Sequence, residues 1–132
     1  MMLGALALVL AGGPALPVQA CPREVVQPER RFSGIYVDDF EGQRFFEGAK
    51  TLADIDLKAR PWVWFAPDIV AHGAKFGIKR RRLGDAYRLV FRGVKRSRAS
   101  RAPVCGYGHM SVFESEIRLT RLERIERLGP TR

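Results

Sequence analysis

The chain after residue 30 carries the alternating apolar and polar pattern that is typical of β-strands. In RRFSGIYVDDF, Phe32 and Tyr36 share one face of the predicted strand, and Ile35 and Val37 share the other. The aspartate pair after Val37 is a turn signal, and GQRFFEG then predicts a short second strand. Together the two segments predict a β-hairpin.

A further strand pattern is the aromatic run PWVWFAPD, in which Trp62 and Trp64 face one way and Val63 and Phe65 the other. Apolar residues on both faces indicate a central strand, or a strand with one face open for ring stacking. Aromatic side chains bury large areas, so one interpretation places both tryptophans in the core. The other makes them an exposed stacking platform.

Residues 51–60 predict one short helix. Thr51 and Asp54 have the spacing of an N-terminal cap, and Arg60 followed by Pro61 ends any helix there. A helix of about seven residues is marginal by itself in water. Packing against the rest of the domain must therefore hold it.

The segment AYRLVFRGV predicts another strand, with Tyr87, Leu89 and Phe91 on one face and Arg88 and Arg92 on the other. Alternation thus places both arginines on the outer face. The preceding IVAHGAKFGIK is punctuated by glycine and predicts a loop or a short irregular strand.

The last segment, HMSVFESEIRLTRLERIERLG, has two periods. It alternates at first, and then Leu119, Leu122, Ile125 and Leu128 recur every three residues. This spacing fits a helix turn or a strand interrupted by a bulge, but on a helix the four positions would spread over half the circumference. We therefore favour a long bulged strand.

These patterns predict a mainly β domain of about five strands with one short helix, the composition of a small barrel or sandwich. Residues 1–20 are uncharged, apolar over LGALALVLA and small at their end, which is the layout of a cleaved signal peptide. The apolar run is too short to span a bilayer. We expect residues 21–132 to form a single exported domain, periplasmic or secreted, with no transmembrane span.

Both cysteines, Cys21 and Cys105, lie in the part expected to be exported. In an oxidising compartment two thiols most simply form one disulfide. The alternative is a lipid anchor at Cys21, because VQAC partly resembles a bacterial lipobox. One sulfur atom cannot do both.

The formal net charge of +9 comes from one segment of the chain. Between residues 79 and 101 there is one acid, Asp85, and elsewhere basic and acidic residues cancel. The basic residues of this segment are Lys79, Arg80, Arg81, Arg82, Arg88, Arg92, Lys95, Arg96, Arg98 and Arg101.

Eight of these ten cations are arginines, whose planar fork pairs with phosphate through two hydrogen bonds. The segment therefore predicts binding to anionic envelope components: phosphate-bearing lipid, polysaccharide or nucleic acid. Trp62 and Trp64 are candidate stacking residues beside it. The alternative is a solvated charge run without a partner.

The landmarks GIYVDDFEGQRFF, PWVWF, YRLVFRG and GYGHMSVFESEIRLTRL occur in the order found in a diffuse family of small exported bacterial proteins. The chain resembles that family over most of residues 21–132. It departs from the family pattern at Asp39 and at Ser111, where the family usually has glycine. The resemblance implies an OB-like barrel and export, and no activity comes with it.

Candidate chemistry is sparse. Cys105 and His109, with Cys21 and His72, make a nominal set of four zinc ligands, but zinc ligands normally come in close pairs. His109 lacks the glycine-flanked serine of a nucleophile elbow. We predict a turn at GYGH that leads into the last strand at His109, and we expect neither a metal nor a cofactor.

Three functional hypotheses follow. The first is a non-catalytic exported binding or structural module of the bacterial envelope. The second is polyanion binding through residues 79–101. The third is a small hydrolase that uses His109.

Overall fold

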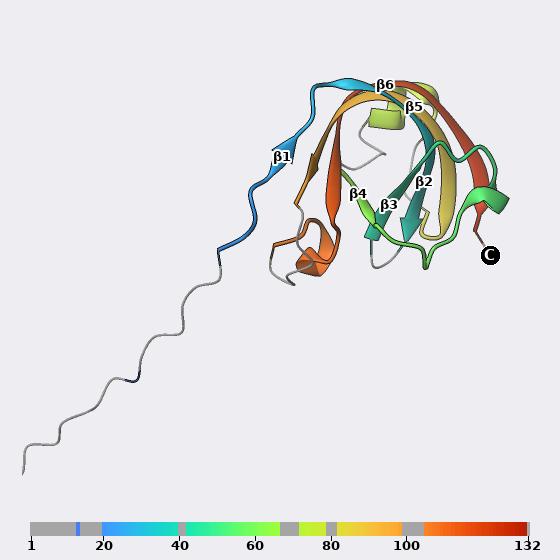
Figure 1. Ribbon diagram of the computed structural model, residues 1–132. Coiled ribbons are helices and arrows are strands. Elements are labelled where there is room, and N and C mark those ends of the chain that lie inside the picture. The colour runs from blue at the N-terminus through green and yellow to red at the C-terminus, as the bar shows by residue number, and fades with distance from the viewer. Residues whose placement is uncertain are drawn as a thin grey trace, which may run out of the picture.

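The structure is a computed structural model that describes residues 13, 20–39, 42–66, 72–78, 82–98 and 105–131 (Figure 1). Apart from Gly13 and Ala20, the predicted signal peptide lies outside these residues. The described strands are β1 (Val25–Val26), β2 (Arg30–Asp39), β3 (Gly42–Glu47), β4 (Val63–Ala66), β5 (Asp85–Ser97) and β6 (Ser115–Pro130). Three short 3-10 turns lie between the strands, namely η1 (Leu52–Asp54), η2 (Ala74–Phe76) and η3 (His109–Ser111).

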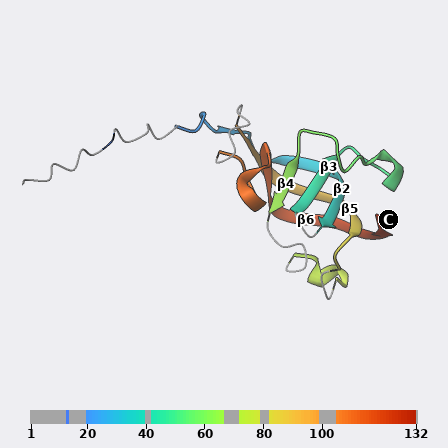
Figure 2. The same cartoon turned by 90° about the horizontal axis from the view of Figure 1, so that it is seen from below.

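Strands β2 to β6 form a closed ring. β2 pairs antiparallel with β3 and β5, β3 pairs antiparallel with β4, and β6 closes the ring by pairing parallel with β4 and antiparallel with β5. Figures 1 and 2 show the strands curving around one interior. The predicted mainly β fold is confirmed, as a barrel. The short strand β1, which pairs antiparallel with the end of β5 and is not part of the ring, was not predicted.

The predicted hairpin is confirmed, and its two faces serve different clusters. Phe32 and Tyr36 point into the barrel core, whereas Ile35 and Val37 belong to a second buried cluster with Ala86. Partly buried side chains from the segment after β3 and from the end of β6 cover this second cluster. Both faces of β2 are therefore buried over its central residues.

The barrel core is built mainly from aromatic rings. The ring centroid of Phe91 lies 5.2 Å from that of Phe32, 5.1 Å from that of Phe45 and 5.2 Å from that of Phe65. Such stacked and edge-on pairs add to the stabilisation that burial of their area provides. Phe91 therefore joins three strands of the ring through one side chain.

Strand β6 accounts for the three-residue spacing in the sequence. Its pairing with β5 skips one residue of β6 at each of three points, so Thr120, Glu123 and Leu128 have no partner across the strand pair. These β-bulges turn Leu119 and Leu122 into the barrel core although they are three residues apart. The predicted bulged strand is confirmed.

The predicted helix of about seven residues is wrong. Thr51 and Asp54 do form a capping box, but the helix is the single turn η1, and the backbone at Ile55 is already extended. Ile55 and Leu57 then pack onto the outer cluster of β2. After the extended residue Ile55, a hydrogen-bonded turn from Asp56 to Ala59 follows in place of a second helical turn.

We expect Phe91→Ala to lower the free energy of unfolding by about 3–5 kcal/mol, because it leaves a cavity among three neighbouring rings. Phe76→Ala is the matched control, since this ring is 40% exposed and should cost no more than about 0.5 kcal/mol. Urea denaturation measures both. Equal losses for the two variants would contradict the described core.

Candidate polyanion-binding face and aromatic cavity

The basic segment of the sequence is strand β5 and its two flanking loops. Tyr87, Leu89 and Phe91 are buried, whereas Arg88 and Arg92 are partly exposed on the outer face, as the alternation predicts. Four of the ten basic residues of the segment lie outside the described residues, namely Lys79, Arg80, Arg81 and Arg101. The six that are described are Arg82, Arg88, Arg92, Lys95, Arg96 and Arg98.

Acids from outside the segment pair with most of its described arginines. Arg88 lies 2.9 Å from Glu126, and Arg92 lies 3.2 Å from Glu29. Arg96 and Arg98 both lie 3.6 Å from Glu24. Within the described part of the chain, Arg82 and Lys95 form no such pair. Four of the six described cations of the segment are thus paired with acids from elsewhere in the chain.

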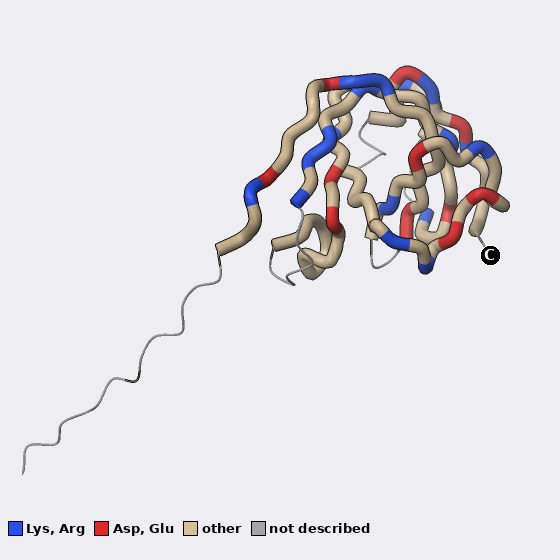
Figure 3. The backbone as a smooth tube through the Cα atoms, viewed as in Figure 1, with Lys and Arg blue, Asp and Glu red and all other residues tan. Residues whose placement is uncertain are grey.

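Pairing across strands creates a different basic feature, which we call the arginine row. Arg31 of β2 lies opposite Arg92 of β5, and Arg92 lies opposite Arg121 of β6. The three residues cross the barrel wall in one line, and the side chains of Arg31 and Arg121 are 65% and 67% exposed. In Figure 3 basic and acidic stretches lie close together along the strands at the top of the barrel.

Two carboxylates hold the arginine row together. Glu123 accepts hydrogen bonds from Arg31 at 2.7 Å and from Arg121 at 3.3 Å. Glu29 accepts from Thr120 at 2.5 Å and from Arg92 at 3.2 Å. Like charges directly opposite on a sheet destabilise it, and these shared acids offset that repulsion.

The same contacts keep both acids ionised. The hydrogen bond from Arg31 lowers the pKa of Glu123, and the hydrogen bonds from Thr120 and Arg92 lower the pKa of Glu29. Three guanidinium groups therefore face two carboxylates, which leaves an excess of one positive charge in the arginine row. Sequence analysis missed Arg31 and Arg121, because they join Arg92 only through the register of three strands.

The two tryptophans lie outside the barrel core. Val63 and Phe65 of β4 point inward, so Trp62 and Trp64 point outward and pack on Phe113, with ring centroids 5.8 and 5.0 Å away. Neither of the two sequence interpretations describes this position fully. The rings form a partly buried cluster against the barrel wall, and they lie apart from the arginine row.

Trp64 is closed to a stacking ligand on at least one face. Gly108 lies so close that a Cβ atom there would be 2.3 Å from ring atoms of Trp64. Trp62 is covered by cations, with the guanidinium of Arg60 4.0 Å and that of Arg44 5.0 Å from its ring centroid. Cation–π contacts of this kind stabilise the cluster.

The segment CGYGHMSVF forms the predicted turn, but His109 does not open the last strand. Tyr107 and Phe113 form an isolated bridge, β6 begins only at Ser115, and His109 is exposed in η3. Glu114 is engaged elsewhere, by Arg60 at 2.6 Å and by the amide of Trp62 at 2.8 Å. Each carboxylate oxygen of Glu114 thus already accepts a hydrogen bond from a group other than His109.

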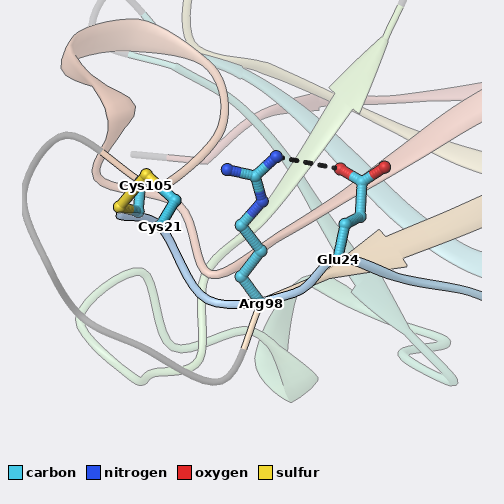
Figure 4. Close-up of a disulfide and its surroundings, with 4 residues drawn as sticks. All are labelled: Cys21, Glu24, Arg98 and Cys105. Carbon is cyan, nitrogen blue, oxygen red and sulfur yellow. Dashed lines mark ion pairs between the residues drawn. A yellow bond between two sulfur atoms is a disulfide. The ribbon is translucent and has the colours of Figure 1, made fainter. Parts of the chain in front are cut away.

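A disulfide joins Cys21 to Cys105, with Cα atoms 5.4 Å apart (Figure 4). This agrees with one of the two alternatives for Cys21. Next to the disulfide, the hydroxyl of Tyr107 donates a 2.7 Å hydrogen bond to Glu24. Burial and this bond raise the pKa of Tyr107 to about 12, and the same bond lowers the pKa of Glu24.

Two neighbouring cavities lie beside the tryptophans. The larger, of about 460 Å³, is bounded by β3 and the chain between β3 and β4. The smaller, of about 210 Å³, lies against the turn and includes His109, Met110 and Phe113. Arg44 and Trp62 line both cavities, so these two side chains form the wall between them.

Comparison with protein-family models, curated proteins and solved structures finds no match for this chain. Among the residues that the structure describes, no three His, Cys, Asp or Glu side chains are grouped to hold a metal ion. In the same residues, no helix has the length and apolar character needed to cross a membrane. The function is therefore inferred from the arginine row.

We expect Glu24→Gln to lower the melting temperature at neutral pH, because it removes the partner of Tyr107, Arg96 and Arg98. A carboxyl group with a lowered pKa stabilises the folded state fully above its unfolded-state value of 4.5. That contribution is lost as the pH falls through the lower folded-state value. The melting curves of wild type and variant should therefore converge in acid, and a constant difference from pH 7 to pH 3 would contradict this account.

Proposed function

We propose that the protein is a non-catalytic, exported binding module of the bacterial envelope that binds phosphate-bearing polyanions. The observation that carries the proposal is the arginine row, in which Arg31, Arg92 and Arg121 lie opposite one another on three adjacent strands. Two of these side chains are about two-thirds exposed. They are available to a ligand while their acids hold them in place.

The chemistry of the arginine row favours phosphate. Guanidinium groups pair with phosphate oxygens through two parallel hydrogen bonds and keep their charge at every physiological pH. Neighbouring strands are about 4.8 Å apart, so the row spans about 10 Å from its first to its last backbone position. This length suits two or more phosphate groups of a polymer better than a single small anion.

The order of the ring supports an OB-like barrel. Counted from β2, the five strands run first, second, third, fifth and fourth around the barrel, with the third and fifth parallel. Five-stranded Greek-key barrels of the OB type commonly bind oligonucleotides and oligosaccharides. This likeness favours a binding module and does not identify the ligand.

Export rests on the signal-like sequence of residues 1–20 and on the use of both cysteines in one disulfide. We propose a periplasmic or secreted location. Export argues against intracellular nucleic acid as the target. Anionic lipid, phosphorylated polysaccharide and extracellular DNA are then the available polyanions.

We expect Arg31→Gln with Arg121→Gln to elute from phosphocellulose at lower salt than wild type. Its binding should also depend less steeply on salt. The slope of the logarithm of the binding constant against the logarithm of the salt concentration should fall by about one unit for each phosphate that the variant no longer neutralises. Lys58→Gln with Lys75→Gln is the matched control, because both lysines are exposed, lie outside the arginine row and carry the same total charge. If both double variants shift equally, net charge explains retention and the arginine row does not.

Intact-mass measurement of the native mature protein tests the state of Cys21. We expect a chain that starts at Cys21 and gains the mass of two hydrogens on reduction. A mass raised by a diacylglycerol group would instead establish the lipid anchor at Cys21 and exclude the disulfide between Cys21 and Cys105.

A further inference from the structure

Strand β6 carries arginine at three positions that are three residues apart, namely Arg118, Arg121 and Arg124. We call these residues the arginine ladder. Residues that lie directly opposite on neighbouring strands share a face of the sheet. The partners of the ladder alternate along β5 with Leu89 and Phe91, whose side chains are buried, so all three arginines point outward. In order, these partners are Val94, Arg92 and Val90.

Two β-bulges produce this outward repeat. On an unbroken strand, residues three apart point to opposite faces. Thr120 and Glu123 have no partner on β5, and each adds one position between successive arginines, which brings the next arginine back to the outer face. The paired positions on β5 are two residues apart, so successive backbone positions of the ladder are about 7 Å apart.

The arginine ladder is exposed and weakly neutralised. The side chains of Arg118 and Arg121 are 58% and 67% exposed, and Arg124 is also exposed. Arg118 lies 3.5 Å from Glu116, and Arg121 lies 3.3 Å from Glu123. Among the described residues, no acid forms an ion pair with Arg124. Ion pairs at such exposed positions contribute little to stability, so a phosphate group can take the place of either carboxylate.

The arginine ladder meets the arginine row at Arg121. The row crosses the sheet there and the ladder follows β6, so one guanidinium group belongs to both. Arg127 continues the three-residue period but takes no part, because it donates hydrogen bonds of 2.7 and 3.1 Å to the buried Asp85. The combined surface has five outward arginines, namely Arg31, Arg92, Arg118, Arg121 and Arg124.

The spacing of the ladder suits a linear phosphodiester chain. Where three carbon atoms separate the phosphates, six single bonds join successive phosphorus atoms. Three backbone bonds of an extended polypeptide span about 3.5 Å, so six bonds span about 7 Å. Each arginine can then pair with one phosphate of such a chain through its planar guanidinium group.

Nucleic acid and poly(glycerol phosphate) both have this repeat, and the surface favours the second. Sites for single-stranded nucleic acid add aromatic rings on which the bases stack. Strands β5 and β6 are described over their full lengths and have no aromatic side chain on their outer faces, because Tyr87 and Phe91 point into the core. Both strands also arch over the barrel (Figure 1), and double-stranded DNA is too stiff to follow so short an arc at low cost.

We propose that the arginine ladder binds successive phosphates of a flexible phosphodiester chain that has three carbon atoms between its phosphates and no bases, as in poly(glycerol phosphate). This inference rests on the proposed function, because the ladder shares Arg121 with the arginine row, and it names the polyanion. The β-bulges of β6 then serve two faces, since they direct leucines into the core and arginines towards the ligand.

The test compares oligomers of equal phosphate number that differ in the group between phosphates: 1,3-propanediol, 1,6-hexanediol or deoxythymidine. Isothermal titration calorimetry measures their binding to the full mature protein, with its disulfide intact, at one low salt concentration. We expect the propanediol oligomer to bind at least as tightly as the thymidine oligomer. It should bind about fivefold more tightly than the hexanediol oligomer, whose extended phosphates are about 11 Å apart. Poly(glycerol phosphate) should bind like the propanediol oligomer.

Arg118→Gln with Arg124→Gln removes both ends of the ladder and leaves the arginine row complete. It should weaken binding of the propanediol oligomer about tenfold and that of pyrophosphate less than about twofold, because two adjacent phosphates fit on the row alone. Lys58→Gln with Lys75→Gln is the matched control, since it removes the same charge from exposed positions outside the ladder. The control should weaken neither probe by more than about twofold.

Equal weakening of propanediol-oligomer binding by the two double variants, or a hexanediol oligomer that binds as tightly as the propanediol oligomer, would overturn the arginine ladder. Tighter binding of the thymidine oligomer than of the propanediol oligomer would make nucleic acid the ligand and overturn the choice of a chain without bases. In these outcomes, pyrophosphate binding that depends on Arg31 and Arg121 leaves the proposed function standing. If no phosphate-bearing probe binds, the proposed function itself fails.

Discussion

Strand β6 is the constraint on which the rest of the structure depends, because among the described strands it alone pairs with both β4 and β5 and so closes the ring. A straight strand of its length could not follow the curved wall of so small a barrel. Three β-bulges bend it, and two of them, at Thr120 and Glu123, keep Leu119, Leu122 and Ile125 directed towards the core. Without them, Leu119 and Leu122 could not both reach the core.

Closure also determines where the charges lie. Because β5 pairs with β2 on one side and β6 on the other, Arg92 is placed between Arg31 and Arg121. Three like charges in line would weaken the sheet, and Glu29 and Glu123 offset this while leaving the outer arginines exposed. The carboxylates that offset the repulsion in this part of the barrel wall thus leave two guanidinium groups exposed, and the proposed phosphate binding rests on these two groups.

Much of the fold follows from local sequence signals. The alternation of the first hairpin, the capping box at Thr51 and the bulged period of the last strand all appear in the structure. The helix after Thr51 does not, because burial of Ile55 and Leu57 against the barrel outweighs a weak local preference. Local propensity decides an element only where packing does not oppose it.

The candidate sites were less predictable than the fold. The sequence drew attention to residues 79–101, yet acids distant along the chain pair with most of the described arginines of that segment. Residues of the arginine row come from three strands, and their meeting depends on register, which the sequence pattern does not specify. The cavity between β3 and the chain before β4 likewise depends on how that chain crosses the barrel wall.

The central claim is that Arg31, Arg92 and Arg121 act as one phosphate site. NMR titration of the arginine Nε–Hε signals with inorganic tripolyphosphate tests it most directly. The account predicts that these three signals shift together along one saturation curve, while those of Arg44 and Arg127 stay in place. Shifts confined to other arginines, or three unrelated curves, would contradict it.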